Sequence, residues 1–529
     1  MYEARRKEVG SRRRSAIEAT RRILGRATPE QLARNRNENL KKLSLYRSFQ
    51  DHSRIIAHFD LDYFFVQAQL LQNPEFRNRP IGAGSDLMIV NSTSNYEARK
   101  FGVKAGVSGI IAKQMCPDLV ILPLDFKLYS RLSKEFHNIM RTEGDSFSCG
   151  GIDEAYIDLT KKLQKFVDPK YIRCHAVNGP CLCRLPRLED LMSENDSYEE
   201  ISTKVCEICN KEETEYLVEL NFPPTLEELI RFIRMRVLVE LNLTCSGGCA
   251  PTYPVAKVCS DFRKPNGQTI VLPEDFEDFN FSLKLNKFGG IGPVMSERLS
   301  AFEVETIKDA FEKNEQLSII LSPCQLDSLL SLISGLNGPP CIDGPLKNPS
   351  GKPCINDSDK YTIGHESTFT PSADPDYVFK RLEEVVEHAI YQASKEAKIT
   401  SAISIKIKYE DHSIQTRIQG VPSLPFTDKD NIFTICSEML EKCLGPSMRL
   451  LGVRFTVNNN ETKIQERKVQ NTIIPPTTKG TLGKKSSLAE TNKVKKETND
   501  RMSEDEVIRE LMDAQGLSPV PKRKKINNS

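Results

Sequence analysis

Two stretches of the chain each place carboxylates on a predicted strand, and no other feature constrains the fold as much. In "RIIAHFDLDYFF", which begins at Arg54, alternation predicts one strand face that carries Ile56, His58, Asp60 and Asp62. In "CGGIDEAYIDLT", which begins at Cys149, Asp153 and Glu154 stand side by side at the head of a second predicted strand. Adjacent side chains on a strand point to opposite faces, so this pair can share a target only where the backbone turns, which the preceding glycines allow. Acidic residues also mark strand ends, and for this segment alone that interpretation stays open.

If the two strands are neighbours in one sheet, their carboxylates form a cluster of hard oxygen ligands. Asp60, with Asp62 as a further candidate, would then meet Asp153 and Glu154. Such a cluster suits Mg²⁺, which binds a few carboxylates together with phosphates and water. Two ions about 3.5–4 Å apart can stabilise both the attacking and the leaving oxygen of a phosphoryl transfer. The pattern predicts a phosphoryl-transfer site on a palm-like sheet, and a solvated acidic face is the alternative.

Two further segments offer groups that a triphosphate would need. "NSTSNYEARKFGVKAG" contains Thr93, Tyr96 and Arg99, and the spacing of the last two places them on one helix face. "SDFRKPNGQ" adds Arg263 and Lys264 at a predicted turn. Arginine can bind phosphate with two hydrogen bonds, and hydroxyl groups add single ones. Each residue alone could equally form a surface ion pair, so the prediction depends on their convergence.

A glycine turn opens a predicted helix in "KFGGIGPVMSERL", within a segment that reads as helical from 283 to 335. Gly290, Ile291 and Gly292 would let backbone N–H groups at a helix N-terminus face a phosphate. Contacts of this kind hold a nucleic-acid backbone without reading its sequence.

The charge of the chain is unevenly distributed. Over all 529 residues the net charge is +2, but residues 1–54 contain 15 Lys/Arg and 6 Asp/Glu, a local +9 that leaves −7 for the rest. This arm reads as helical, with a break at Gly25 and Pro29. A basic arm favours a polyanionic partner, although a solvated helix face is the alternative. No apolar run approaches the roughly 18 residues that cross a membrane, so no membrane association is expected.

The remaining segments are less regular. Residues 161–224 read as a polar, irregular insertion, and they contain Cys174, His175, Cys181, Cys183, Cys206 and Cys209. Zn²⁺ is not favoured there, because the spacing fits no common zinc module and 15 cysteines without a framework suggest reduced thiols inside a cell. A linker is expected at 336–358, then an α+β module with the order strand, helix, strand, strand, helix, strand. The tail reads as disordered, and "PKRKK" at 521–525 is typical of a nuclear localisation signal, with a solvated charge run as the alternative.

Six motifs in collinear order resemble the Y-family of translesion DNA polymerases, over about residues 55–457. They are "FDLDYFF", "STSNYEARKFGVKAG", "SCGGIDEAYIDL", "CAPTYPVAKVCSDFRKPNGQ", "GGIGPVMSERL" and "TIGHESTF". The basic arm is similar to the N-terminal clasp of one branch of that family.

The resemblance implies an α+β, multidomain right-hand polymerase whose palm carries an antiparallel-type β-sheet. The implied parts are a helical clasp at 1–54, a palm at 55–62 and 126–273 with its insertion at 161–224, fingers at 63–125, a helical thumb with a helix-hairpin-helix at 274–335, the linker, a β-rich little finger at 359–457, and the tail at 458–529.

The same resemblance assigns roles to individual residues. It implies that Asp60, Asp153 and Glu154 are catalytic and, with the backbone carbonyl of Leu61, bind two Mg²⁺ ions. The implied nucleotide-binding residues are Thr93, Tyr96, Arg99 and Lys264, with Phe65 as the aromatic gate against ribonucleotides and Phe64 beside it; both could instead be plain core aromatics. DNA contacts fall on Gly290, Ile291 and Gly292. Two positions depart from the family pattern, Gln69 where Glu is common and Thr252 where Asn is common.

The expected function is therefore template-directed DNA synthesis opposite damaged bases, with low fidelity and no proofreading. Its partners would be template–primer DNA and deoxynucleoside triphosphates, with a recruiting protein such as a replication clamp at the tail. A monomer in the nucleus is expected. Two alternatives stay open: a DNA-binding scaffold without activity, and a nucleotidyl cyclase, since "GGIDE" resembles the Gly-Gly-Asp-Glu loop of palm-fold cyclases.

Overall fold

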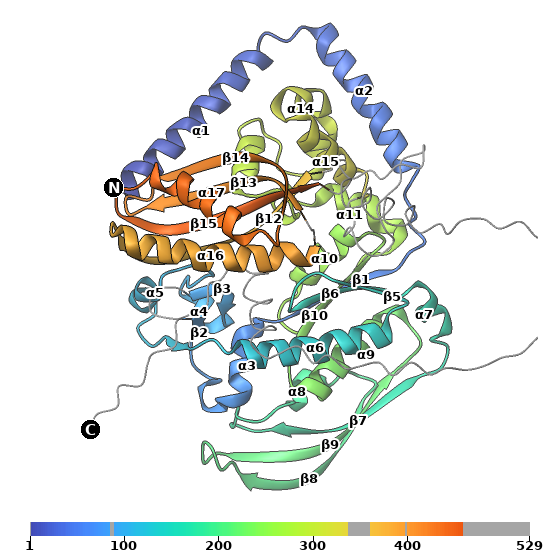
Figure 1. Ribbon diagram of the computed structural model, residues 1–529. Coiled ribbons are helices and arrows are strands. Elements are labelled where there is room, and N and C mark those ends of the chain that lie inside the picture. The colour runs from blue at the N-terminus through green and yellow to red at the C-terminus, as the bar shows by residue number, and fades with distance from the viewer. Residues whose placement is uncertain (1, 85–88, 337–359, 397–398, 459–529) are drawn as a thin grey trace, which may run out of the picture. The chain divides into compact units, whose positions relative to one another are not determined.

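The computed structural model describes residues 2–84, 89–336, 360–396 and 399–458 (Figure 1). The chain divides into two compact units, one formed by Arg12–Pro345 and the other by Leu346–Ser529 together with Met1–Ser11. All but the first residue of the predicted linker, and the predicted tail after Asn458, lie outside the described residues. No helix within the described ranges has the length and apolar character needed to cross a membrane.

The larger unit is built on a five-stranded sheet. Its strands lie in the order β11 (Gln268–Ile270), β10 (Cys245–Ala250), β1 (Ile56–Leu61), β6 (Glu154–Asp158) and β5 (Ser146–Cys149). All neighbours are antiparallel except β10 and β11. The two acid-bearing strands are therefore direct neighbours in the sheet, which is the condition that the predicted carboxylate cluster requires.

Helices cover both faces of this sheet (Figure 1). Helices α6 (Phe126–Glu143) and α9 (Leu226–Leu241) share one core with the side chains of Ala57, Phe59 and Leu61. Helix α10 (Tyr253–Phe262) packs on the other face, where a Cβ atom at Gly248 would lie 2.1 Å from the carbonyl oxygen of Ala256. Glycine at that position is what lets α10 approach β10 so closely.

The first acid-bearing strand is shorter than predicted. Strand β1 ends at Leu61, and Tyr63 adopts a left-handed conformation with φ of 36° before α3 (Phe64–Gln72) begins. Alternation in "DLDYFF" continues past Leu61 in the sequence, but the backbone no longer follows it. Asp62 consequently leaves the face that carries Asp60, which corrects the predicted grouping of these two residues.

A smaller sheet and a helical region flank the palm-like core. The sheet has the order β3 (Ile89–Ser94), β2 (Ile81–Gly84), β4 (Val120–Leu122), accompanied by α4 (Tyr96–Lys100) and α5 (Gly109–Met115). The segment 283–335, predicted to be helical, contains α12 (Pro293–Ser300), α13 (Ile307–Glu312), α14 (Asn314–Ile320) and α15 (Pro323–Ile333), and α11 (Phe276–Ser282) precedes it.

The basic arm forms two helices, α1 (Tyr2–Leu24) and α2 (Pro29–Arg47), with the break that Gly25 and Pro29 predict. Helix α2 is anchored on the helical region, because Leu43 is only 2% exposed within its core and Asn39 Nδ2 donates to the carbonyl of Asn314 at 2.7 Å. In the part of α1 that belongs to this unit, Ile17 and Leu24 are partly buried against the same core, and the ion pair of Arg13 with Glu297 at 3.4 Å is exposed.

The insertion at 161–224 is not irregular, which corrects the prediction. After α7 (Thr160–Lys165) it forms an antiparallel sheet in the order β7 (Lys170–Asn178), β9 (Glu212–Phe222), β8 (Ser197–Val205), with α8 (Leu188–Leu191) between β7 and β8. Strand β8 is exposed along its whole length. Its sequence therefore lacks the apolar alternation by which a half-buried strand is recognised.

The smaller unit has the predicted order of elements. These are β12 (Lys360–Ser372), α16 (Pro375–Glu396), β13 (Ile399–Tyr409), β14 (Ile414–Pro425), α17 (Lys429–Glu441) and β15 (Met448–Asn458). The strands form one antiparallel sheet in the order β12-β15-β13-β14, and both helices contribute to its core.

Candidate active site

The predicted carboxylates meet at one end of the central sheet. The register of β1 and β6 pairs Asp60 with Glu154. Asp153 lies in the turn just before β6, and its carbonyl accepts a hydrogen bond from Leu61 N–H at 2.8 Å. Because the N–H and C=O of one strand residue face the same neighbouring strand, the Leu61 carbonyl also faces this turn. The structure therefore brings together the four residues that were predicted to bind metal.

The two glycines before the acidic pair make this turn possible. A Cβ atom at Gly150 would lie 2.8 Å from Glu154 Oε1, and one at Gly151 would lie 3.4 Å from Asp153 Oδ1. Larger residues would press on both carboxylates. The turn closes with a hydrogen bond from Gly150 N–H to the Glu154 carbonyl at 3.2 Å.

Two lysines neutralise part of the negative charge. Lys264 Nζ lies 2.5 Å from Asp60 Oδ1, and Lys257 forms an ion pair with Glu154. Burial would raise the pKa of Glu154, but the hydrogen bond from His58 and the charge of Lys257 outweigh it and lower the pKa to about 2. Asp153 differs, because burial, Asp60 and Glu154 together raise its pKa to about 6.

His58 is a buried member of the same cluster. Its side chain is fully buried, with Nδ1 2.8 Å from Ser260 Oγ and Nε2 3.3 Å from Glu154 Oε2. Burial is the largest effect and lowers the pKa of His58, so the ring is neutral near pH 7.

The donor set fits a divalent cation. Ligand atoms of His58, Asp60 and Glu154 all lie within 4.8 Å of one another. Asp153 lies close to this group, since the charges of Asp60 and Glu154 both raise its pKa. Three carboxylates and a backbone carbonyl are hard oxygen donors of the kind that Mg²⁺ prefers. The cluster can therefore bind cations, provided that Lys264 and Lys257 give up their ion pairs.

Asp62 does not belong to this donor set. Its side chain is fully buried, accepts from Ser246 Oγ at 2.7 Å and from Asn266 N–H at 2.8 Å, and so has both oxygens engaged. Burial raises the pKa of Asp62 against the effect of these hydrogen bonds. Its role is structural: it ties the end of β1 to the turn that carries Lys264.

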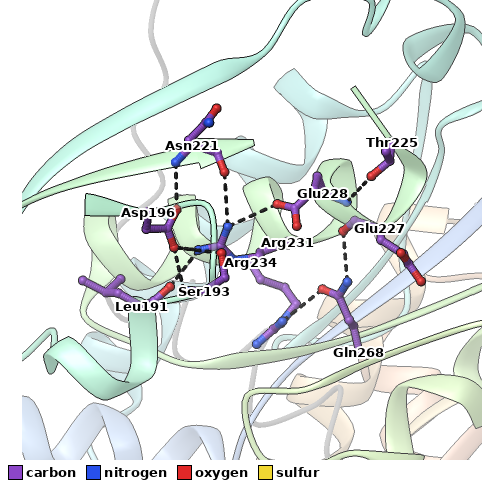
Figure 2. A network of polar contacts seen from close by, with 10 residues as sticks. All are labelled: Leu191, Ser193, Asp196, Asn221, Thr225, Glu227, Glu228, Arg231, Arg234 and Gln268. Atoms are coloured by element: carbon purple, nitrogen blue, oxygen red, sulfur yellow. Dashed lines mark hydrogen bonds and ion pairs between the residues drawn. The ribbon is translucent and has the colours of Figure 1, made fainter. Parts of the chain in front are cut away.

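Arg234 of α9 stabilises that turn through hydrogen bonds. Arg234 donates to the Cys245 carbonyl at 3.1 Å, to Gln268 Oε1 at 3.0 Å (Figure 2) and to Asn266 Oδ1 at 2.6 Å. Gly267 allows the tight turn, because a Cβ atom there would lie 1.9 Å from the Arg263 carbonyl oxygen. The backbone that carries Lys264 is therefore firmly held, and it positions the Lys264 side chain next to Asp60.

A second buried network lies next to Arg234 on the same helix (Figure 2). Arg231 forms an ion pair with Asp196, whose side chain is fully buried, and donates to the Leu191 carbonyl at 2.8 Å. Asp196 also accepts from the N–H groups of Ser193 at 2.7 Å and Asn221 at 2.8 Å. This network fastens the insertion to α9, the helix that also supports the Lys264 turn.

The predicted nucleotide-binding residues fall into two groups. Tyr96 stacks edge-on with Tyr63 at 5.5 Å, and the Arg99 guanidinium lies 4.8 Å from the Tyr96 ring centroid. Burial, followed by the charge of Asp62, raises the pKa of Tyr96 to about 12, and smaller effects of Lys264 and Asp60 show that it lies near the carboxylates. The side chain of Thr93 lies outside the described residues.

Phe64 and Phe65 form the second group and are 2% and 4% exposed. The Phe65 ring packs against Tyr129 at 4.5 Å and against Phe126 at 6.3 Å. Gln69, where the family pattern has Glu, donates to the Tyr129 hydroxyl at 3.0 Å. The departure at Gln69 therefore supports the aromatic group that holds Phe65.

The glycine turn is open to solution. Gly290 has φ of +88°, Gly292 precedes α12, and a Cβ atom at either would meet nothing within 4 Å. Ile291 between them is buried, 8% exposed, and anchors the turn. This exposed backbone can approach a phosphate closely.

Sequence reasoning missed four residues that position the site. His58 could have been found, because it shares the predicted strand face with Asp60. Lys257 and Asn266 lie within the motif "CAPTYPVAKVCSDFRKPNGQ", whereas Arg234 gave no such signal, because it comes from another element and reaches the site only through tertiary packing.

Two family models match the chain, and both carry the name impB/mucB/samB. One matches residues 59–261, and the model of the family's C-terminal domain matches residues 360–466. The two matches flank the helical region and together cover more than half of the chain.

Curated relatives and solved structures agree with these matches. The chain is 32% identical over 414 residues to DNA polymerase kappa of Caenorhabditis elegans, covering 77% of this chain and 66% of that one. It is 29% identical to DNA polymerase kappa of Homo sapiens, over 79% of this chain and 49% of that one. DNA polymerase IV of Metallosphaera sedula is 26% identical over 411 residues, which make up 76% of this chain and 96% of that one. A solved Y-family DNA polymerase chimera superposes with a TM-score of 0.53 at 22% identity, over 76% of this chain and 99% of that one. The chain thus spans between about half and two thirds of these kappa relatives.

The raised pKa of Asp153 predicts a pH-dependent effect of Asp153→Asn in metal-free protein. An unfolded Asp has a pKa of about 3.9, whereas the native value is about 6. The wild type therefore loses stability as the pH rises from about 4 to about 6, by at most roughly 3 kcal/mol. An amide does not ionise, so we expect the variant to melt above the wild type near pH 7.5 and to keep only about half of this advantage near pH 5.

Thermal unfolding followed by circular dichroism in EDTA measures this difference. Asp118→Asn, at an exposed position, is the control and should shift the melting temperature equally at both pH values. A shift for Asp153→Asn that is equally large at both pH values would contradict the assignment.

Proposed function

The chain belongs to the impB/mucB/samB family of Y-family DNA polymerases, and on that premise we propose that it copies template DNA, including damaged template. It would add deoxynucleotides to a primer 3′-hydroxyl, without proofreading. The observation that carries the proposal is the register of β1 and β6, which pairs Asp60 with Glu154 and sets Asp153 beside them. The side chains of Asp60 and Glu154 are only 19% and 16% exposed, which supports a cation-binding cluster over a solvated acidic face.

Asp60, Asp153, Glu154 and the Leu61 carbonyl would hold two Mg²⁺ ions. When bound, such ions lower the pKa of the primer hydroxyl and offset the charge of the departing pyrophosphate. Lys264 would transfer from Asp60 to the triphosphate, and Arg99 would add a second cation. Tyr96, fixed between Tyr63 and Arg99, would orient the triphosphate.

The DNA would be held mainly through its backbone. The exposed turn at Gly290–Gly292 would bind phosphates, and the basic arm would add electrostatic attraction that does not depend on sequence. Recruitment by a replication clamp or another protein, action as a monomer, and import into the nucleus through residues 521–525 complete the proposal; that basic cluster lies outside the described residues.

Primer extension is the direct test. With Mg²⁺ and four deoxynucleotides, we expect template-dependent extension on undamaged DNA and continued extension past a minor-groove guanine adduct. Asp153→Ala should abolish incorporation while DNA affinity is kept, and it leaves both lysine ion pairs in place. Tight DNA binding without extension by the wild type would favour an inactive scaffold. Cyclic product formed from a nucleoside triphosphate without DNA would favour the cyclase.

The gate assignment predicts a change in sugar selectivity. Phe65→Ala should lower the preference for deoxynucleotides over ribonucleotides, but it removes a buried ring and would cost about 3–5 kcal/mol of stability. Phe65→Leu is the milder variant, and Phe64→Leu on the same buried turn of α3 is its matched control. Single-nucleotide incorporation kinetics with dNTP and rNTP measure the ratio. A ratio that moves equally in both leucine variants would remove Phe65 from the gate role.

The arm predicts a salt-dependent contribution to DNA affinity. Removing residues 1–27 leaves α2 with its anchors Asn39 and Leu43 in place but takes away the partly buried Ile17 and Leu24, so the protein should stay folded with a modestly lower melting temperature. We expect weaker binding of template–primer at low salt and a smaller slope of log affinity against log salt, because fewer counterions are released. Fluorescence anisotropy over a salt series measures both quantities. An unchanged slope would mean that α1 does not touch DNA.

A further inference from the structure

Four cysteines of the palm insertion meet in space, although their spacing in the chain fits no common zinc module. Cys181 and Cys183 follow β7, while Cys206 and Cys209 lie in the turn between β8 and β9. Their four sulfur atoms all lie within 4.8 Å of one another. Pairing of β7 and β8 with the same strand β9 brings the two halves together, and this pairing is not visible in the cysteine spacing.

The thiols are not buried as part of a hydrophobic core. A free buried cysteine usually behaves as a small apolar side chain among others. Cys181, Cys183 and Cys206 are 1%, 8% and 3% exposed, yet within the described residues they form a cluster of their own, with Cys209 packed against it. Apolar packing therefore does not account for their convergence.

Backbone N–H groups point at the sulfur atoms. Cys183 N–H donates to Cys181 Sγ at 3.3 Å, and the N–H groups of Ile208 and Cys209 donate to Cys206 Sγ. The Cys-x-x-Cys turn is closed by Cys206 N–H to the Lys211 carbonyl at 2.8 Å. Donors in these positions stabilise thiolates, which are the form that binds metals.

Charged side chains fix the other half of the cluster. Arg187 donates to the Cys181 carbonyl at 2.5 Å and to the Gly179 carbonyl at 3.2 Å, which holds the loop after β7 in place. Arg184 pairs with the buried Glu213 of β9 at 2.9 Å, so the loop is tied to the strand that both halves share.

We propose that Cys181, Cys183, Cys206 and Cys209 bind one Zn²⁺ ion as a structural site. Thiolates are soft ligands that select zinc over magnesium, and tetrahedral Zn–S bonds of about 2.3 Å place sulfur atoms about 3.8 Å apart. Four protein ligands leave no open position, so the ion has no part in nucleotidyl transfer. It would join the loop after β7 to the tip of the β8–β9 hairpin, in which the exposed strand β8 lies at the edge of the sheet.

The other candidate ligands of the insertion do not take part. Cys174 on β7 belongs to the core shared with α9, and His175 Nδ1 lies 2.9 Å from Glu215 Oε1. Cys174 therefore provides a buried cysteine in the same sheet as a matched control.

Metal analysis of the full chain tests the site. Protein purified without chelator should contain about one zinc ion per chain, which an organomercurial reagent releases as four thiols react. Cys206→Ser combined with Cys209→Ser should lose the zinc, whereas Cys174→Ala should retain it. Wild type loaded with Co²⁺ should show the visible absorption of a tetrahedral thiolate site, a readout that does not depend on the folding of a variant.

Three outcomes would overturn the proposal. They are wild-type protein without metal whose four thiols are free, a disulfide among these cysteines after rapid alkylation of cell extracts, and zinc retained at full stoichiometry in the double variant. None of these readouts depends on polymerase activity, so the zinc site and the proposed function are tested independently of each other.

Discussion

The pairing of β1 with β6 is the constraint on which the site depends. Its register sets Asp60 opposite Glu154, and the turn before β6 adds Asp153 to the same end of the sheet. A shift of one residue would send the two facing carboxylates to opposite faces. Burial, together with the charges of Asp60 and Glu154, raises the pKa of Asp153, whereas Lys257 and Lys264 offset the negative charge at the other two positions.

Much of this arrangement follows from the sequence, because each part has a local signature. Alternation around Asp60 and the glycines before Asp153 predict two strands and a turn, and the apolar core of the sheet makes them neighbours. The element order of the smaller unit can be predicted equally well, since the sequences of both helices and all four strands show the apolar periodicity of the element that they form. The break between α1 and α2 follows from Gly25 and Pro29.

The features that the sequence did not predict share a physical cause, because they depend on contacts between segments far apart in the chain. Asp62 continues the alternation of its strand, but the left-handed Tyr63 and the partners Ser246 and Asn266 turn it into a buried support. Strand β8 carries no apolar alternation because both of its faces are exposed. The cysteines around it converge only through the shared partner β9.

The ion pair of Lys264 with Asp60 has a consequence for the order of events at the site. One ammonium group cannot serve a carboxylate and a phosphate with equal strength at the same moment, and the turn from Lys264 to Gly267 is too firmly held by Arg234 to move far. A cation that takes over Asp60 therefore sets Lys264 free, and an arriving anion draws Lys264 away from Asp60. Each event would make the other easier, so under the proposed function cation and triphosphate would bind cooperatively, with a lysine rather than a moving domain as the link between them.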